Sequence, residues 1–159
     1  MIVVVMGVSG SGKTTIGERL AGLLGCEFIE GDDFHPPANV AKMAAGTPLE
    51  DADRWPWLER LNEELRKRKS AVLACSALKQ VYRDILLEQI PESAVIHLQG
   101  SFELIQSRLK ARQHRYMPAS LLESQFAALE PPRQAIEVDI ARPVELCVGE
   151  IASRLRPSG

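Results

Sequence analysis

The chain has 159 residues, of which 45% are hydrophobic and 25% are charged, and its net charge of −2 excludes a general attraction to nucleic acid or anionic membranes. This length suits one soluble domain, residues 1–159, and no apolar stretch approaches the ~20 residues of a membrane span. Three widely spaced cysteines without a CxxC pair argue against a disulfide framework or a zinc site and predict a cytoplasmic protein.

Strands and helices are predicted to alternate along the whole chain. The β-branched run from Ile2 to Met6 is typical of a strand buried on both faces, and Gly7 ends it. Asp53 is the predicted N-cap of one helix. Further strands are expected at residues 26–30, 71–75, 94–98 and 135–140, and helices at 13–24, 38–45, 53–69, 79–88, 101–112, 118–129 and 143–155.

This alternation predicts an α/β fold with three layers: a five-stranded parallel sheet covered by helices on both faces. We expect the second strand to lie beside the first. Ligands bind outside the carboxyl ends of the strands in such sheets, so the loops that follow the strands are the candidate sites.

A glycine-rich motif, GxxxxGK[ST], follows the first strand and opens the first helix. Its glycines let the backbone point several N–H groups at phosphate oxygens, and the helix adds the positive end of its dipole. In this P-loop pattern Lys13 reaches the β and γ phosphates of ATP, and the hydroxyl of Thr14 faces Mg²⁺. The motif residues are Gly7, Val8, Ser9, Gly10, Ser11, Gly12, Lys13 and Thr14. Because the chain lacks the NKxD and DxxG motifs of GTPase switches, the motif predicts a phosphotransferase.

Polar side chains follow the second predicted strand. Asp32, Asp33 and His35 lie in segment 31–37, which ends in two prolines. We expect them to face the γ-phosphate, where a carboxylate accepts the proton of an acceptor hydroxyl and holds its oxygen in line. We assign this role to Asp32, with Asp33 as the alternative. An ordinary turn, in which both Asp side chains bond local N–H groups and His35 is structural, stays open.

Three arginines recur at helical spacing near the predicted helix 101–112. Arg108, Arg112 and Arg115 stand at i, i+4 and i+7, so their guanidinium groups can share one face. Such a cluster predicts a lid at about residues 108–120 that closes over ATP and neutralises charge on the transferring phosphoryl group. In the absence of a P-loop the same pattern would favour a solvated surface.

Two further segments carry cations. Lys79, Tyr82 and Arg83 begin the helix after the third strand, and Arg54 lies between Asp51 and the two tryptophans that follow it. Together these side chains can surround a small anion. The alternative is surface solubility for the cations and core packing for the tryptophans, and spacing does not separate the two interpretations.

Four segments resemble the gluconokinases of the small P-loop kinase type: MGVSGSGKTT, EGDDFHPPANVAKMAAGTPLEDADRWPWL, ACSALKQVYRD and LQGSFELIQSRLKARQHRYMPASLLESQFAALEPP. Many kinases share the first segment, whereas the patterns GDxxHPxxNxxKM, DxDRxPWL and CSALKxxYRD are narrower. The resemblance covers about residues 2–155. It implies a fold like those of shikimate and nucleoside monophosphate kinases, and the ATP- and Mg²⁺-dependent phosphorylation of D-gluconate on its 6-hydroxyl.

The resemblance also implies roles for single positions and a homodimer. Ser76 stands where many P-loop enzymes have a Walker-B Asp, as a possible outer-shell partner of magnesium. The other implied positions are Thr15 at the phosphates, Asp32, His35, Arg54, Lys79 and Arg83 at the sugar acid, Arg108, Arg112 and Arg115 in the lid, and Arg142 and Pro143 around the adenine.

Two other functions remain open from the residues themselves. One is a kinase for another sugar acid or polyol, and the other is a nucleotide-binding regulatory protein without turnover. A shikimate-type kinase would carry a DxD after the second strand and a glycine triplet after the third, and the chain has neither.

Overall fold

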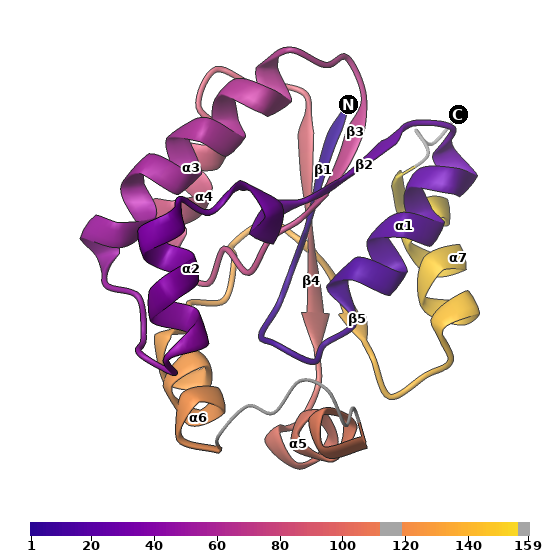
Figure 1. Cartoon of the computed structure of the whole chain (residues 1–159). Coiled ribbons are helices and arrows are strands. Elements are labelled where there is room, and N and C mark those ends of the chain that lie inside the picture. Colours follow the sequence, from indigo (N-terminus) through magenta and orange to yellow (C-terminus); the bar gives the residue numbers. More distant parts are fainter. Residues whose placement is uncertain (112–118, 156–159) are drawn as a thin grey trace.

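The computed structural model describes residues 1–111 and 119–155. Its centre is a five-stranded, all-parallel sheet in the order β2-β3-β1-β4-β5 (Figure 1). The predicted α/β class and the parallel sheet are therefore confirmed. The strands are β1 (Ile2–Met6), β2 (Glu27–Glu30), β3 (Ala71–Ala74), β4 (Ser93–Gln99) and β5 (Ile136–Asp139).

The position of β2 differs from the prediction. Ala71 of β3 pairs with Ile2 of β1 on one side and with Glu27 of β2 on the other, so β3 separates the first two strands. The prediction that β2 lies beside β1 is wrong, because the order of strands along the chain does not fix which strands pair when helices make the crossovers. As a result, about 10 Å of sheet lies between the end of β1 and the end of β2.

Helices cover both faces of the sheet, as predicted. Figure 1 shows α1 and α7 on one face, α3 and α4 on the other, and α5 and α6 beyond the end of β4. The helices are α1 (Lys13–Leu24), α2 (Pro37–Ala44), α3 (Asp51–Arg66), α4 (Gln80–Leu86), α5 (Phe102–Ala111), α6 (Ala119–Ala128) and α7 (Val144–Leu155), and a 3₁₀ turn, η1, spans Gly31–Phe34. No helix in residues 1–111 and 119–155 is long and apolar enough to cross a bilayer.

The two hydrophobic cores follow from the alternation of side chains along β1. Val3 and Val5 lie in the core that contains Leu20 of α1, whereas Val4 lies in the core that contains Leu61 of α3. All three valines are almost completely buried, which is typical of a strand inside a three-layer α/β sheet. This burial fixes β1 and therefore the loop that leaves its carboxyl end.

Helix α3 begins earlier than predicted. Its N-cap is Glu50 instead of Asp53, and the two side chains form a capping box in which each accepts the other residue's backbone N–H. The helix therefore begins at Asp51, two residues before the predicted start, because Asp53 satisfies the cap from the third helical position. The early start places Asp51 and Arg54 in the first turn, at the end of the sheet where the loops gather.

Candidate active site

The phosphate loop connects β1 to α1. Gly10 and Gly12 have φ angles of 83° and 92°, in the left-handed region that favours glycine. A Cβ atom on Gly10 would also lie 2.8 Å from the side chain of Leu109 on α5. These conformations turn the backbone into the N-terminus of α1, which begins at Lys13, as the motif requires. Phosphate binding at this loop stays a prediction.

The two functional side chains of the motif point in different directions. The Nζ atom of Lys13 donates to the carbonyl oxygen of Val8 at 3.0 Å, across the loop. The exposed hydroxyl of Thr14 donates to the carboxylate of Glu30, the last residue of β2. The next residue, Thr15, is half-buried. Glu30 was not among the residues expected at the site, although its place beside Gly31 at the carboxyl end of a strand is a usable signal.

Asp32 of η1 faces His35, the residue that directly follows η1. The Nε2 atom of His35 lies 3.7 Å from Oδ1 of Asp32, and the other ring nitrogen, Nδ1, lies 3.2 Å from the amide nitrogen of Asn39. Because that amide donates to Nδ1, the proton of a neutral His35 ring is on Nε2 and faces Asp32. The Asp32 side chain is 68% exposed while that of His35 is 3% exposed. The acceptor-side carboxylate is thus open to solvent and backed by a buried histidine.

Trp57 of α3 holds this loop in place. Its ring stacks on His35 with centroids 4.0 Å apart, and its Nε1–H donates to the carbonyl oxygen of Gly31 at 2.8 Å. Asn39 of α2 adds a second tie, a 2.8 Å bond from its amide to the carbonyl oxygen of Asp53. Trp57 is therefore a core residue, in agreement with one of the two interpretations of the sequence. Its ring also orients the loop that carries Asp32.

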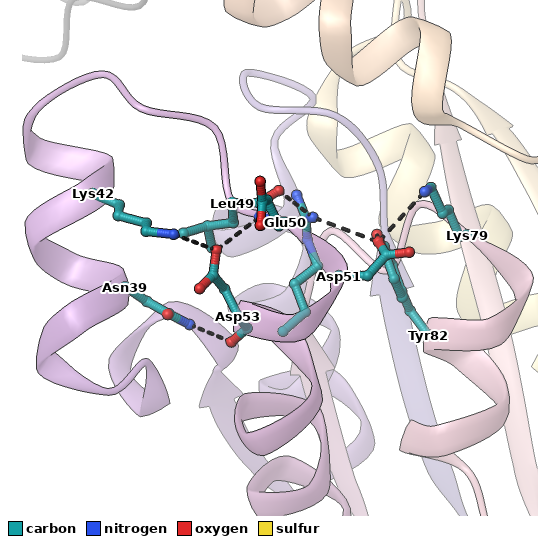
Figure 2. Close-up of polar contacts among 9 residues, drawn as sticks. Asn39, Lys42, Leu49, Glu50, Asp51, Asp53, Lys79 and Tyr82 are labelled. Atoms are coloured by element: carbon teal, nitrogen blue, oxygen red, sulfur yellow. Dashed lines mark hydrogen bonds and ion pairs between the residues drawn. The ribbon is translucent and has the colours of Figure 1, made fainter.

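The carboxylate of Asp51 lies next to two of the cations that were predicted to bind an anion. Figure 2 shows it between the start of α3 and the side chains of Lys79 and Tyr82, and its Oδ1 lies 3.4 Å from Nζ of Lys79 and 4.0 Å from Nη1 of Arg54. The Tyr82 hydroxyl donates to the same carboxylate. These contacts, with the Tyr82 bond as the largest, hold the pKa of Asp51 below its ordinary value, while burial and the Asp51 carboxylate raise that of Tyr82 to about 12. The sequence did not single out Asp51 as a site residue.

Arg83 is placed differently from the other cations. It is 3% exposed, and its guanidinium donates to the carbonyl oxygens of Ala77 and Glu130, each at 2.7 Å. Burial lowers its pKa. In this structure Arg83 fastens the loop after β3, where Ala77 has a strained φ of 44°, to the chain that follows α6. Contact with an acceptor stays a prediction for Arg83, and so does a magnesium role for half-buried Ser76.

The phosphate loop and the Asp32 loop leave the same edge of the sheet. Strands β1 and β2 both pair with β3 in parallel, so their carboxyl ends lie at one edge. Thr14, at the start of α1, donates to Glu30, which stands two residues before Asp32 in the chain. Next to these loops, at the end of β3, burial raises the pKa of the Cys75 thiol to about 12.

The residues predicted at the adenine lie near the end of β5, and their role stays a prediction. Arg108 of α5 donates to the carbonyl oxygen of Ile140, just after β5, and so brings the first lid arginine to the segment that precedes Arg142. Arg142 itself forms an ion pair with Glu150 of α7, with Pro143 next to it in the chain. Arg112 and Arg115 lie outside the described residues, as does most of the predicted lid.

A strand, a glycine loop and a helix that present Lys13 and Thr14 at one end of a parallel sheet, with the Asp32 loop at the same end, define an α/β P-loop phosphotransferase. A family model described as an AAA domain matches residues 2–132. The chain is 50% identical to the thermosensitive gluconokinase of Escherichia coli (strain K12) over 143 residues, covering 87% of this chain and 76% of that protein.

Solved structures agree with this class. A gluconokinase from Sinorhizobium meliloti 1021 has a TM-score of 0.87 at 44% identity, covering 96% of this chain and 94% of that one. Shikimate kinase from Aquifex aeolicus vf5 has a TM-score of 0.64 at 18% identity, covering 98% and 96%, and shows a shared fold. The chain belongs to the gluconokinase family, within the proteins that carry this AAA domain.

Proposed function

We propose that this protein transfers the γ-phosphoryl group of ATP to the 6-hydroxyl of D-gluconate, giving 6-phospho-D-gluconate and ADP. The observation that supports this most directly is that the phosphate loop and the Asp32 loop leave the same end of the parallel sheet, in a chain of the gluconokinase family. Phosphoryl transfer of this kind needs mainly positioning and charge stabilisation, which a rigid crevice between two loops provides.

The nucleotide side is assigned to the phosphate loop. Its backbone N–H groups and Lys13 would hold the phosphates, with Arg108, Arg112 and Arg115 stabilising the transferring group and Arg142 and Pro143 beside the adenine. Oxygen donors suited to magnesium are present, because the Thr14 hydroxyl and the Glu30 carboxylate are in contact and Asp32 follows closely in the chain. Magnesium, when bound with ATP, supplies neutralisation of phosphate charge.

The acceptor side is assigned to Asp32 and His35. Asp32 would accept the proton of the 6-hydroxyl as its oxygen attacks the γ-phosphorus, and the buried His35 would keep the carboxylate oriented. Arg54 and Lys79 would bind the gluconate carboxylate, which takes the place of Asp51 as their anionic partner. A sugar acid with several hydroxyls suits this mixture of carboxylate, imidazole and cations, because a missing hydroxyl leaves a polar group unpaired.

A coupled ADP-release assay with gluconate and a panel of sugar acids and polyols tests the proposal. We expect turnover with gluconate well above the ATP-only background, and a ³¹P NMR signal of a primary phosphate ester in the product. Turnover with another acceptor but none with gluconate would sink the assignment. ATP binding without turnover on any acceptor would point to the regulatory alternative.

Four statements from the sequence stay predictions: the single-domain boundaries, the lid at about residues 108–120, the homodimer and the cytoplasmic location. Size-exclusion chromatography with light scattering separates a dimer from a 17.5 kDa monomer. Limited proteolysis with and without an ATP analogue locates the lid, because closure over the nucleotide would protect it.

A further inference from the structure

The side chain of Gln125 on α6 forms hydrogen bonds with the phosphate loop. The backbone N–H of Ser9 donates to Oε1 of Gln125 at 2.7 Å, and Nε2 of Gln125 donates to the Ser9 hydroxyl at 3.0 Å. A carboxamide offers one acceptor and one donor side by side, which matches the N–H and hydroxyl of a serine. The two residues are 116 positions apart in the chain, so this is a tertiary contact that fixes one residue of the loop from outside.

Apolar packing and the polar contact lie side by side. Leu122 of α6 and Val8 of the loop belong to one hydrophobic core. Val8, the neighbour of Ser9, and Phe126, the neighbour of Gln125, also line a cavity of about 250 Å³ that extends along the end of β4. Close contacts are missing at that cavity, so the Gln125 to Ser9 bonds add a directional link beside it.

The end of α6 is tied to the acceptor side. Just past the helix, the N–H of Glu130 donates to the carbonyl oxygen of Leu78 at 2.7 Å, and its carboxylate accepts the N–H of Gln80 at 2.8 Å. The carbonyl oxygen of Glu130 also accepts the Arg83 bond. One helix thus connects Ser9 in the phosphate loop to the segment that carries Lys79, the two walls of the crevice.

We propose that Gln125 is a positioning residue for phosphoryl transfer: it holds the Ser9 segment of the phosphate loop in the geometry that receives the γ-phosphate. The proposal rests on the kinase function proposed above. The carboxamide is neutral, and it has a second N–H on Nε2 that Ser9 does not use and that can donate to a phosphate oxygen. A carboxylate at this position would keep the bonds to Ser9, because the serine hydroxyl can turn and donate, but it would repel phosphate.

The test compares Gln125→Ala with Gln125→Glu. For Gln125→Ala we expect kcat to fall about tenfold, as for two lost hydrogen bonds, with a smaller change in the KM for gluconate. Gln125→Glu should unfold at a temperature close to that of the wild type yet bind a non-hydrolysable ATP analogue more weakly than Gln125→Ala does. A merely structural role predicts the reverse, rescue by Glu of both stability and binding, and that result would overturn the proposal.

Ser9→Ala and Glu123→Ala complete the experiment. Ser9→Ala removes only the hydroxyl half of the contact, so it should cost less than Gln125→Ala, and the double variant should cost less than the sum of the two. Glu123→Ala changes an exposed side chain of the same helix and should leave turnover and analogue binding unchanged. Additive losses in the Ser9 and Gln125 variants would contradict the proposal. Titration with the ATP analogue tests the role of Gln125 even if gluconate proves not to be the acceptor.

Discussion

The two walls of the crevice are built in different ways. The nucleotide wall, residues 7–15, is one continuous segment whose shape follows from two left-handed glycines and the start of α1. The acceptor wall takes side chains from η1, α2, α3 and α4, which are joined by contacts such as Trp57 with His35 and Tyr82 with Asp51. Most of the nucleotide wall is therefore local in the chain, with Gln125 as a contact from outside it, whereas the acceptor wall is assembled by tertiary packing.

Because of this difference, substitutions in the two walls should affect turnover and folding stability differently. A change in the nucleotide wall should reduce turnover while the fold persists, because the side chains of Lys13 and Thr14 are not part of the hydrophobic cores. A change in the acceptor wall should affect turnover and folding together wherever the side chain also holds a loop. Four predictions test this separation, in order of decreasing expected effect on turnover.

Lys13→Ala should have the largest effect on turnover. Removal of the ammonium group takes away charge stabilisation of the transferring phosphoryl group, and we expect kcat to fall on the order of a thousandfold with little change in unfolding temperature. Steady-state kinetics and thermal unfolding measure the two quantities. Arg19→Ala, which removes an exposed cation from the same helix, is the control. A kcat near that of the wild type would refute the role of Lys13.

Asp32→Asn should reduce kcat about a hundredfold, as for a positioned acid or base, and leave ATP binding nearly intact. Its carboxylate lies in the open part of the acceptor wall, so stability should change little. Asp33→Asn is the matched control, since His35 pairs with Asp32. A larger loss in Asp33→Asn would assign the base to that residue instead.

Trp57→Ala should destabilise the protein by about 3–5 kcal/mol, because it empties a buried site. Urea unfolding measures this loss. Where the variant still folds, the KM for gluconate should rise more than the KM for ATP, since the ring positions the Asp32 loop. Trp57→Phe keeps the stack on His35 but loses the bond to Gly31, at a cost of about 1 kcal/mol. Equal increases in both KM values would show that the two walls are not independent.

The smallest effect concerns stability at acidic pH. The folded-state pKa of Asp51 lies below its unfolded value, chiefly through the Tyr82 hydrogen bond. Its contribution is therefore complete above the unfolded pKa, about 4, and is lost as the pH falls through the lower folded value. The wild type should lose stability more steeply below about pH 4 than Asp51→Asn does. Urea unfolding at a series of pH values measures the slopes, and parallel curves would contradict the assignment.

The sequence predicted the strand, glycine loop and helix of the nucleotide wall, but only part of the acceptor wall. Asp32 and His35 were expected opposite the loop, and they follow a strand that ends at the same edge of the sheet as β1. Glu30, Asp51 and Gln125 were not expected, because their contacts join residues 16, 31 and 116 positions apart. Periodicity and short motifs describe neighbours in the chain and contain no information on such pairs.

Predicted helix and strand positions were close to those observed, with an exception at the start of α3. There, Glu50 and Asp53 can each act as a cap, and only their reciprocal bonds in the folded chain select Glu50. The anion-binding cations show the same ambiguity. Arg54 and Lys79 lie close to the Asp51 carboxylate, while Arg83 is buried against backbone carbonyl oxygens. In the sequence, all three are simply cations near the start of a predicted helix, and nothing there separates them.

The sequence by itself determined the phosphate loop, the alternation of strands and helices, and the resemblance that gives the acceptor. These depend on consecutive residues, because glycine conformations, helix starts and hydrophobic periods are local properties of a chain. Only the tertiary structure decided that β3 lies between β1 and β2 and that α6 joins the two walls of the crevice. Strand pairing and helix docking depend on side chains that are distant in sequence. The spacing between β1 and β2, and the contact of α6 with the phosphate loop, therefore follow from tertiary packing.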